Sequence, residues 1–472
     1  MIGSIVIIYF LAMVAVGILL SRRIKVASDF LIAGRKLGLW LTTGTLVAVQ
    51  IGVGVTLGGA ELAAEYGMWP GVWFGIGGGG GLILAGLIAS APMRRRGGYV
   101  PLDFFASRYS ETRVVRLWAW FSNIPSLLGV FVAQIMAAGS VLSIFGFSYS
   151  RGIILIGLVI MVYSVSSGMW GVVVTDFIQV GIIVVGIPIV AIAAVGNLGG
   201  DSQIQEIVAT PFIPPGMLSR AVFIILPFLL ALPVSYDAFM RYQSAESDRV
   251  AKYGCVVAGI LVVSVSICVG LAGAAGRILY PTVAAAEVFP HMIKTLLSPL
   301  SAGIVVAALL AAAMSSANCI LLSLAGSFTR DLYNKVLYPI MGLDELKHTK
   351  LLSRAVVVVA LIVGILIAFR SRGILNTMIL FNYPYMASML VPLLGGILWK
   401  GATTQGAFAG MIAGGTVGIL AFTSALVDRF NGLINVDLGL LMAYIFSFVA
   451  FVLVSLKTTP RKNGIRQKRE HL

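Results

Sequence analysis

Apolar runs of about 20 residues recur along the whole chain, separated by short polar segments. A run of that length is what an α-helix needs to cross the hydrocarbon layer of a bilayer. Backbone polar groups inside that layer must be paired within the protein, so we expect an all-α integral membrane protein. The runs predict about 13 transmembrane helices, at residues 3–21, 38–64, 69–92, 114–146, 152–168, 170–196, 219–240, 250–276, 296–328, 352–369, 374–399, 404–427 and 435–456.

The composition supports a membrane protein and excludes a soluble one. Hydrophobic residues make up 59% of the chain and charged residues 11%, whereas soluble domains carry about 25% charged residues. The net charge of +15 is divided among short segments between the runs, which suits contact with a lipid bilayer and argues against nucleic acid as a partner.

Basic residues predict the orientation, because Lys and Arg collect in segments that stay in the cytoplasm. An N-terminus outside places most of the 33 basic residues inside, Arg241 among them, and makes 457–472 a cytoplasmic basic tail. The first run is followed by Arg22 and Arg23 rather than by a cleavage site, so we expect it to remain as a helix. We predict a multi-pass protein of the cell membrane with its C-terminus in the cytoplasm.

Enzymatic chemistry finds no support in the sequence. The three His residues lie outside the apolar runs, and the glycine-rich stretch Gly75–Gly81 lies within one rather than between a strand and a helix. The three Cys residues have no metal-ligand spacing. We therefore expect neither an enzyme nor a bound cofactor.

Ser315 and Ser316 stand side by side within the ninth run, among small residues. Such hydroxyls often only allow two helices to approach or bond to their own backbone. They are also hard oxygen ligands of the kind that an alkali cation needs. The pair is therefore a candidate cation site, with helix packing as the alternative.

Two runs are poorly suited to regular helix. Gln50–Thr56 combines two glycines with β-branched residues, and Pro227 and Pro233 bracket part of the seventh run. Broken helices near the bilayer centre expose carbonyl and amide groups to ions and solutes in transporters.

The two broken runs are five apart, as an inverted repeat of five helices plus five requires. The predicted division is an extra helix in 1–22, a first repeat in 38–196, a second repeat in 219–399 and two further helices in 404–456.

Asp176 is a carboxylate within the sixth run. A carboxylate in hydrocarbon costs several kcal/mol, so it should face a cation, a proton path or hydrogen-bond donors. The alternative is a position close enough to the inner surface to remain hydrated.

Several segments together resemble the sodium/solute symporter family, which carries sugars, proline, pantothenate and choline. They are Ser28–Arg35, Gly168–Gln179, Arg241–Ser247, Ala312–Ser316 and Asp331–Tyr333. The resemblance implies thirteen helices around a five-plus-five inverted repeat of the LeuT type. It also implies a sodium site made by the carbonyls of Ala48, Ile51 and Ala312 and by the hydroxyls of Ser315 and Ser316.

By the same resemblance, Asp176 and Asn318 are candidates for a second cation site or for tuning the first. Relatives with a second sodium carry hydroxyls where this chain has Asn318 and Cys319. Cys is a soft ligand that suits sodium poorly, so we predict one sodium per cycle.

The solute is predicted to be a small polar organic molecule. Pro92–Tyr109 and Lys400–Gly406 resemble the choline-carrying branch, but Gln50, Val130 and Ile379 replace aromatic residues of its cage, which disfavours choline. Candidate solute contacts are Gln50, Gly52, Gly54, Gln134, Tyr236, Asp237 and Asn382. Asp237 indicates a cationic or amine solute, or else an ordinary charge at the cytoplasmic mouth.

We therefore predict sodium-driven symport by alternating access, with a monomer as the functional unit. Proton coupling through Asp176 is the first alternative. A membrane sensor or channel on the same fold, without coupled transport, is the second.

Overall fold

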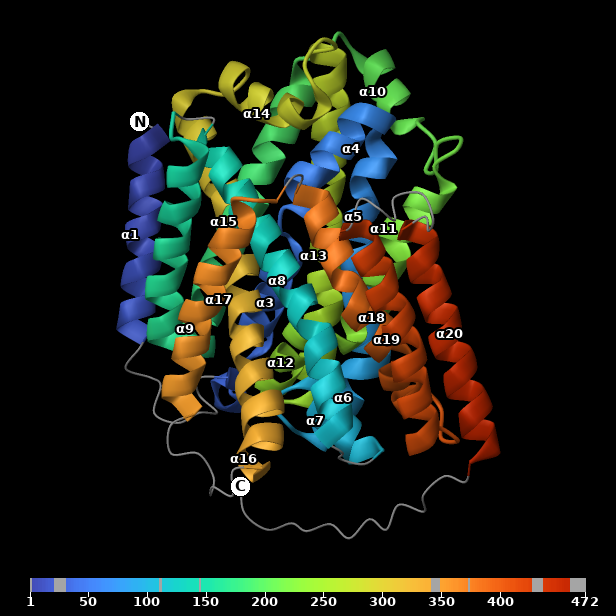
Figure 1. Cartoon of the computed structure of the whole chain (residues 1–472). Helices are drawn as coiled ribbons and strands as arrows, with labels where there is room; N and C mark the ends of the chain where they lie inside the picture. The colour runs from blue at the N-terminus through green and yellow to red at the C-terminus, as the bar shows by residue number, and fades with distance from the viewer. Residues whose placement is uncertain are drawn as a thin grey trace.

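The computed structural model describes residues 2–20, 31–109, 113–143, 146–340, 349–371, 374–426 and 436–458, and within them the named elements are all helices (Figure 1). The long helices are α1 (Ile2–Leu20), α3 (Leu39–Gln50), α5 (Met68–Leu84), α8 (Arg113–Ser143), α9 (Tyr149–Gly196), α11 (Leu218–Ala231), α13 (Asp248–Leu279), α15 (Pro299–Gly326), α17 (Thr349–Ala368), α18 (Ile374–Leu398), α19 (Thr404–Leu426) and α20 (Val436–Lys457). The shorter ones are α4 (Gly59–Tyr66), α6 (Ser90–Arg96), α7 (Pro101–Arg108), α10 (Asp201–Val208), α12 (Tyr236–Ser244), α14 (Ala285–Thr295) and α16 (Tyr338–Ile340).

Every predicted membrane run coincides with helix in the structure. Ten helical stretches of the described residues are long and apolar enough to cross a membrane, and the bent pair α3 and α4 makes an eleventh. Two shorter apolar helices, Tyr149–Val162 and Met386–Leu398, fall on two further predicted runs. The all-helical membrane fold is confirmed, while the number of thirteen crossings and the division into repeats stay predictions.

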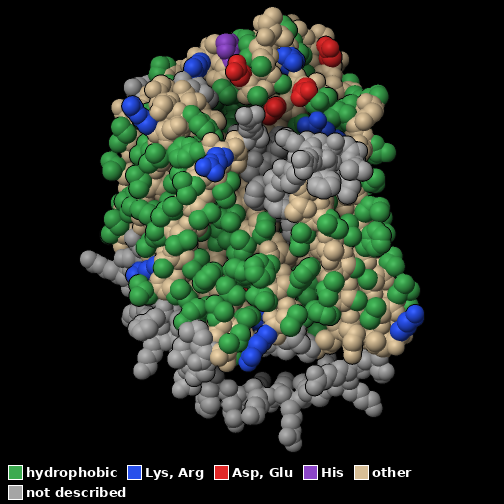
Figure 2. Space-filling view, viewed as in Figure 1, with side chains coloured by type: hydrophobic (Ala, Val, Ile, Leu, Met, Phe, Trp, Pro, Cys, Tyr) green, Lys and Arg blue, Asp and Glu red, His purple; other side chains and the backbone are tan. Residues whose placement is uncertain are grey.

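The bundle has a buried centre and an apolar flank. In the most apolar stretch of α15 and its continuation, 94% of the residues are buried, whereas in that of α1 28% are buried. Hydrophobic side chains cover the visible flank, as a lipid-facing surface requires (Figure 2). The start of α1 and the end of α20 lie at opposite ends of the bundle, and α10 and α14 lie at the same end as the start of α1 (Figure 1).

The predicted interruption of the second run is present between α3 and α4. Ile51 leaves the helical conformation with φ −84° and ψ 69°, a π-helical turn follows at Gly54–Gly58, and the two helices are bent by 57°. Glycine and β-branched residues favour helix weakly, so the chain unwinds here at low cost. The end of α3 therefore presents carbonyl groups inside the bundle.

The seventh run is interrupted in a gentler way. A 3-10 turn, Leu232–Val234, contains Pro233, and the extended Ser235 separates it from α12. The Ser235 hydroxyl accepts a hydrogen bond from the Ala238 amide at 3.4 Å and so caps α12. The stretch Leu218–Ser244 still passes as one membrane span, without the sharp bend of the second run.

Candidate functional site

Ser315 and Ser316 face the carbonyl end of α3. The Ser315 hydroxyl lies 2.9 Å from the Ala48 carbonyl oxygen and 3.2 Å from that of Ala312. The Ser316 hydroxyl lies 3.2 Å from the Ala48 carbonyl oxygen and 3.1 Å from that of Val49. Both serines are buried, so these oxygens converge in a dry region.

The converging groups fit an alkali cation. All are hard oxygen atoms of neutral groups, namely two hydroxyls and several main-chain carbonyls. The carbonyls of α3 are available because the last carbonyls of a helix lack intrahelical partners. The structure brings Ala48, Ala312, Ser315 and Ser316 together as the sequence predicts, while Ile51 is the buried residue at which the helix ends. The Val49 carbonyl is an addition that the sequence analysis missed, although any carbonyl in the last turn of a broken helix is a candidate.

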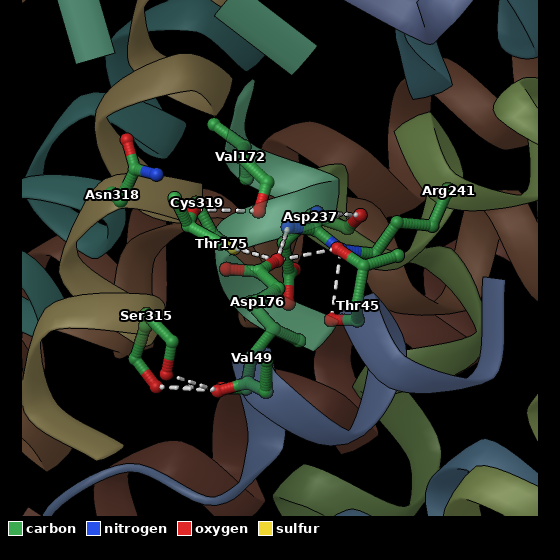
Figure 3. A network of polar contacts seen from close by, with 12 residues as sticks. Thr45, Val49, Val172, Thr175, Asp176, Asp237, Arg241, Ser315, Asn318 and Cys319 are labelled. Atoms are coloured by element: carbon green, nitrogen blue, oxygen red, sulfur yellow. Dashed lines mark hydrogen bonds and ion pairs between the residues drawn. The ribbon is translucent and has the colours of Figure 1, made fainter. Parts of the chain in front are cut away.

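Asp176 lies in a second polar group, here called the Asp176 cluster: Thr45, Asp176, Arg241 and Cys319. Its Oδ2 accepts hydrogen bonds from the Thr45 hydroxyl at 2.5 Å and from the Cys319 thiol at 3.3 Å. The Arg241 Nη2 atom lies 3.9 Å from the same oxygen. Figure 3 shows these side chains meeting between α3, α9, α12 and α15.

Two sequence expectations are corrected by this cluster. Asp176 is 0% exposed, so the hydrated position near the inner surface is wrong. Arg241 is not part of an inner loop, because it is 1% exposed and its Nε donates to the Thr45 carbonyl at 3.2 Å. The segment after Pro233 re-forms a helix inside the bundle and carries the guanidinium to the buried carboxylate.

Asn318 points to a different neighbour. Its Oδ1 accepts a short hydrogen bond from the Ser164 hydroxyl on α9, and its Nδ2 has no hydrogen-bond partner among the described residues. Ser164 precedes Gly168, where φ of 48° and ψ of −148° break the helical path within α9. Asn318 therefore joins α15 to the interrupted part of α9, and its role as a cation ligand stays a prediction.

One cavity collects six of the predicted solute contacts. Gln50, Gly52, Gly54, Gln134, Tyr236 and Asp237 line it, whereas the Asn382 side chain lies outside the described part of the structure. The sequence analysis missed Asn123 and Ser126 of α8 and the rings of Phe74 and Phe228. Helical spacing offers a signal for α8, because Asn123, Ser126, Val130 and Gln134 follow one another every three or four residues.

Gln134 and Gly52 connect the cavity to the serine pair. The Gln134 Oε1 atom accepts a hydrogen bond from the Val53 amide at 3.0 Å, within the break after α3. A Cβ atom on Gly52 would lie 2.8 Å from the Gln134 Nε2 and 2.8 Å from the Ser316 hydroxyl. The absence of a side chain at Gly52 thus allows α8 and α15 to approach the broken backbone from two sides.

Asp237 lies at the cavity and not at an exposed mouth. Asp237 is 9% exposed, and its Oδ2 atom lies 3.4 Å from the Gln50 Nε2 atom. Its place in the cavity lining fits a solute contact, and that role stays a prediction.

A buried group of oxygen atoms beside a cavity, both formed at an interrupted helix, is an arrangement typical of secondary transporters. The sequence profile of the Sodium:solute symporter family matches residues 30–414, and the chain belongs to this family. Its function is sodium-coupled transport of a solute, and catalysis is not its role.

Relatives and solved structures agree with this assignment. The sodium/pantothenate symporter of Haemophilus influenzae is 28% identical over 66% of each chain, and the sodium/proline symporter of Escherichia coli is 24% identical over 95% of this chain and 91% of its own. A sodium-coupled sialic acid symporter in a substrate-bound outward-open state superposes with a TM-score of 0.79, at 20% identity over 97% of this chain and 98% of its own. The Mhp1 nucleobase-cation-symport-1 transporter superposes with a TM-score of 0.60, at 15% identity over 92% and 97%. The fold is therefore of the LeuT type.

Proposed function

We propose that the coupling sodium binds where the end of α3 meets α15. The ligands are the carbonyls of Ala48, Ile51 and Ala312 and the hydroxyls of Ser315 and Ser316. The observation that carries this proposal is that both hydroxyls reach the Ala48 carbonyl, at 2.9 and 3.2 Å, from another helix. The Val49 carbonyl, 3.1 Å from the Ser316 hydroxyl, supplements the set.

The site couples sodium to the solute through the broken backbone. Sodium between α3 and α15 holds the two helices together and orders the segment Ile51–Gly54, which forms one wall of the solute cavity. When the helices separate, the ligands of the ion and the wall of the cavity are lost together. Both ligands therefore favour the state in which α3 and α15 are in contact. Thermodynamic linkage requires that two such ligands raise each other's affinity.

We also propose a single sodium per cycle, which the Asp176 cluster supports. The guanidinium of Arg241 already lies 3.9 Å from the Asp176 carboxylate and balances its charge. The nearby Cys319 thiol is a poor sodium ligand. In this proposal Asp176 positions Thr45 and Arg241 beside the sodium site.

The test is sodium-dependent uptake into proteoliposomes by the double variant S315A/S316A. Loss of two ligands should raise the sodium concentration for half-maximal uptake by about tenfold or more, since each tenfold change corresponds to about 1.4 kcal/mol. The matched control is S323A, because among the described residues the buried Ser323 hydroxyl bonds only its own helix, at the Cys319 carbonyl, 3.0 Å away. Unchanged sodium dependence in S315A/S316A, or uptake driven by a pH gradient without sodium, would contradict the proposal.

We also infer the orientation: the end that carries α10 and α14 faces outside, and the C-terminus faces the cytoplasm. Acidic side chains gather at the α10 and α14 end of the visible face (Figure 2), while the basic residues Arg94, Arg95 and Arg96 end α6 at the other. An epitope tag after Leu472 should become accessible in cells only after permeabilisation. Labelling of the tag in intact cells would reverse the assignment.

A further inference from the structure

The solute cavity carries a single kind of charge. Asp237 is the one charged side chain among its described lining residues. The stretch 374–385, whose side chains lie outside the described part of the structure, contains no charged residue in its sequence. Among the described lining residues, a solute in this cavity therefore meets a carboxylate and no cationic side chain.

Among the described residues, little occupies the Asp237 carboxylate. Its one hydrogen-bond partner among the described residues is the Gln50 amide, at a long 3.4 Å. Arg241, one helical turn further along α12, donates its Nη1 to the main-chain carbonyl of Asp237 at 2.7 Å and not to the carboxylate. The guanidinium is oriented instead toward Thr45 and Asp176.

The rest of the lining is suited to a positively charged nitrogen. Phe74 and Phe228 form an edge-to-face pair with ring centroids 5.8 Å apart, and Tyr236 lines the same cavity. Aromatic faces attract cations through the ring quadrupole, most strongly where water is scarce. A carboxylate and aromatic rings that line one cavity are the groups that can recognise an ammonium group, whether protonated or quaternary.

From these observations we infer that the transported solute carries a positively charged nitrogen, which pairs with Asp237 against the aromatic side of the cavity. This inference rests on the proposed sodium-coupled transport. The amides of Gln50, Asn123 and Gln134 and the hydroxyl of Ser126 line the same cavity and are available to polar groups elsewhere on the solute. A solute whose only charge is negative would be repelled by Asp237 and would find no cationic partner among the described lining residues.

The test is thermal unfolding of the purified full chain in detergent, with and without sodium, against probes that differ in charge. Putrescine and choline represent cations, proline and glycine betaine zwitterions, glucose a neutral polyol and pantothenate an anion. We expect a sodium-dependent rise in Tm with a probe that contains a charged nitrogen, and the primary-amine and quaternary probes distinguish the two kinds of ammonium. Stabilisation by glucose or pantothenate alone, or by none of the probes, would overturn the inference.

The variant D237N sharpens the test because it keeps the volume and removes the charge. D237N should bind the stabilising probe at least tenfold more weakly than the wild type does. The control is D201N, the same change at an exposed position on α10, which should bind the probe as tightly as the wild type does. Equal binding by D237N would overturn the inference. Sodium alone should still stabilise D237N but not S315A/S316A. Loss of the sodium effect in the wild type would instead count against the proposed function.

Discussion

Two buried groups of charged side chains differ in how completely they are paired. The first, here called the paired cluster, is Asp103, Arg116, Arg330 and Asp331, and the second is the Asp176 cluster. In the paired cluster, Arg116 bridges Asp103 and Asp331 with both contacts at 2.8 Å, and the Tyr236 hydroxyl donates to the other oxygen of Asp331 at 2.5 Å. In the Asp176 cluster the guanidinium lies 3.9 Å from the carboxylate, and Asp176 Oδ1 has no hydrogen-bond partner among the described residues.

The difference suggests that the paired cluster stabilises the fold, whereas the Asp176 cluster can rearrange during transport. Buried ionised groups are tolerated where close partners satisfy them, and both oxygens of Asp331 meet this condition. Looser pairing suits the movement of Asp176 and Arg241 that the proposed separation of α3 and α15 requires. Tyr236 connects the solute cavity to the paired cluster, because its side chain lines the cavity and its hydroxyl donates to Asp331.

The largest effect is expected from Arg116→Met. This change leaves the buried carboxylates of Asp103 and Asp331 without their shared partner, which typically costs about 3–5 kcal/mol. Tm measured at a fixed scan rate should fall by several degrees. The control is Arg95→Met: Arg95 pairs with Asp248 at 2.6 Å, but its side chain is 71% exposed, and such surface pairs contribute at most about 1 kcal/mol. Equal losses in the two variants would show that burial does not distinguish these pairs.

Arg241→Met should destabilise the protein less than Arg116→Met does. Arg241 faces one carboxylate at 3.9 Å, where Arg116 faces two at 2.8 Å, so we expect a loss at or below about 3 kcal/mol. The double variant D176N/R241M should recover most of the lost Tm, because neither charge remains without a partner. A double variant as unstable as the single one would mean that Arg241 stabilises through its hydrogen bonds to Thr45 instead.

Gly52→Ala should weaken sodium coupling with a modest loss of stability. The added Cβ lies 2.8 Å from both the Gln134 amide and the Ser316 hydroxyl, and relief of such overpacking typically costs about 1–3 kcal/mol. The sodium concentration for half-maximal uptake should rise. Gly181→Ala on α9, where the Cβ meets open space, is the control. Superimposable uptake curves for the wild type and Gly52→Ala would contradict this link between the cavity and the sodium site.

The smallest effect concerns pH and Asp103 on α7. Burial acts to raise the pKa of Asp103, but the guanidiniums of Arg330 and Arg116 and the Tyr99 amide hold this pKa below its ordinary value of 3.8. A lowered pKa gives stabilisation that is fully present above the ordinary value and is lost as the pH falls through the folded-state value. The Tm difference between wild type and Asp103→Asn should therefore be the same at pH 7 and pH 5 and shrink only below about pH 4. A difference that already shrinks between pH 7 and pH 5 would mean that Asp103 is less tightly paired.

The sequence predicted the helices and the break in the second run well, because both depend on local properties. Apolar length predicts a membrane helix, and Gly52 and Gly54 weaken helix wherever they stand. The prediction that Arg241 lies in an inner loop was wrong because it, too, rested on local sequence alone. A polar segment after a proline resembles the end of a membrane span, and only the packing of α12 against α3 and α15 shows that the guanidinium is buried.

The sequence by itself determined that this chain is an all-helical membrane protein, and its motifs identified the sodium/solute symporter family. The tertiary structure decided which polar groups meet: Ser315 with Ala48, Thr45 with Asp176 and Gln50 with Asp237, pairs that are 267, 131 and 187 residues apart along the chain. Helix periodicity states which residues share a face, but the rotation of each helix and the angle at each break depend on close packing of all their neighbours. A hydroxyl or a carboxylate therefore acquires its role only when the helices around it are in place.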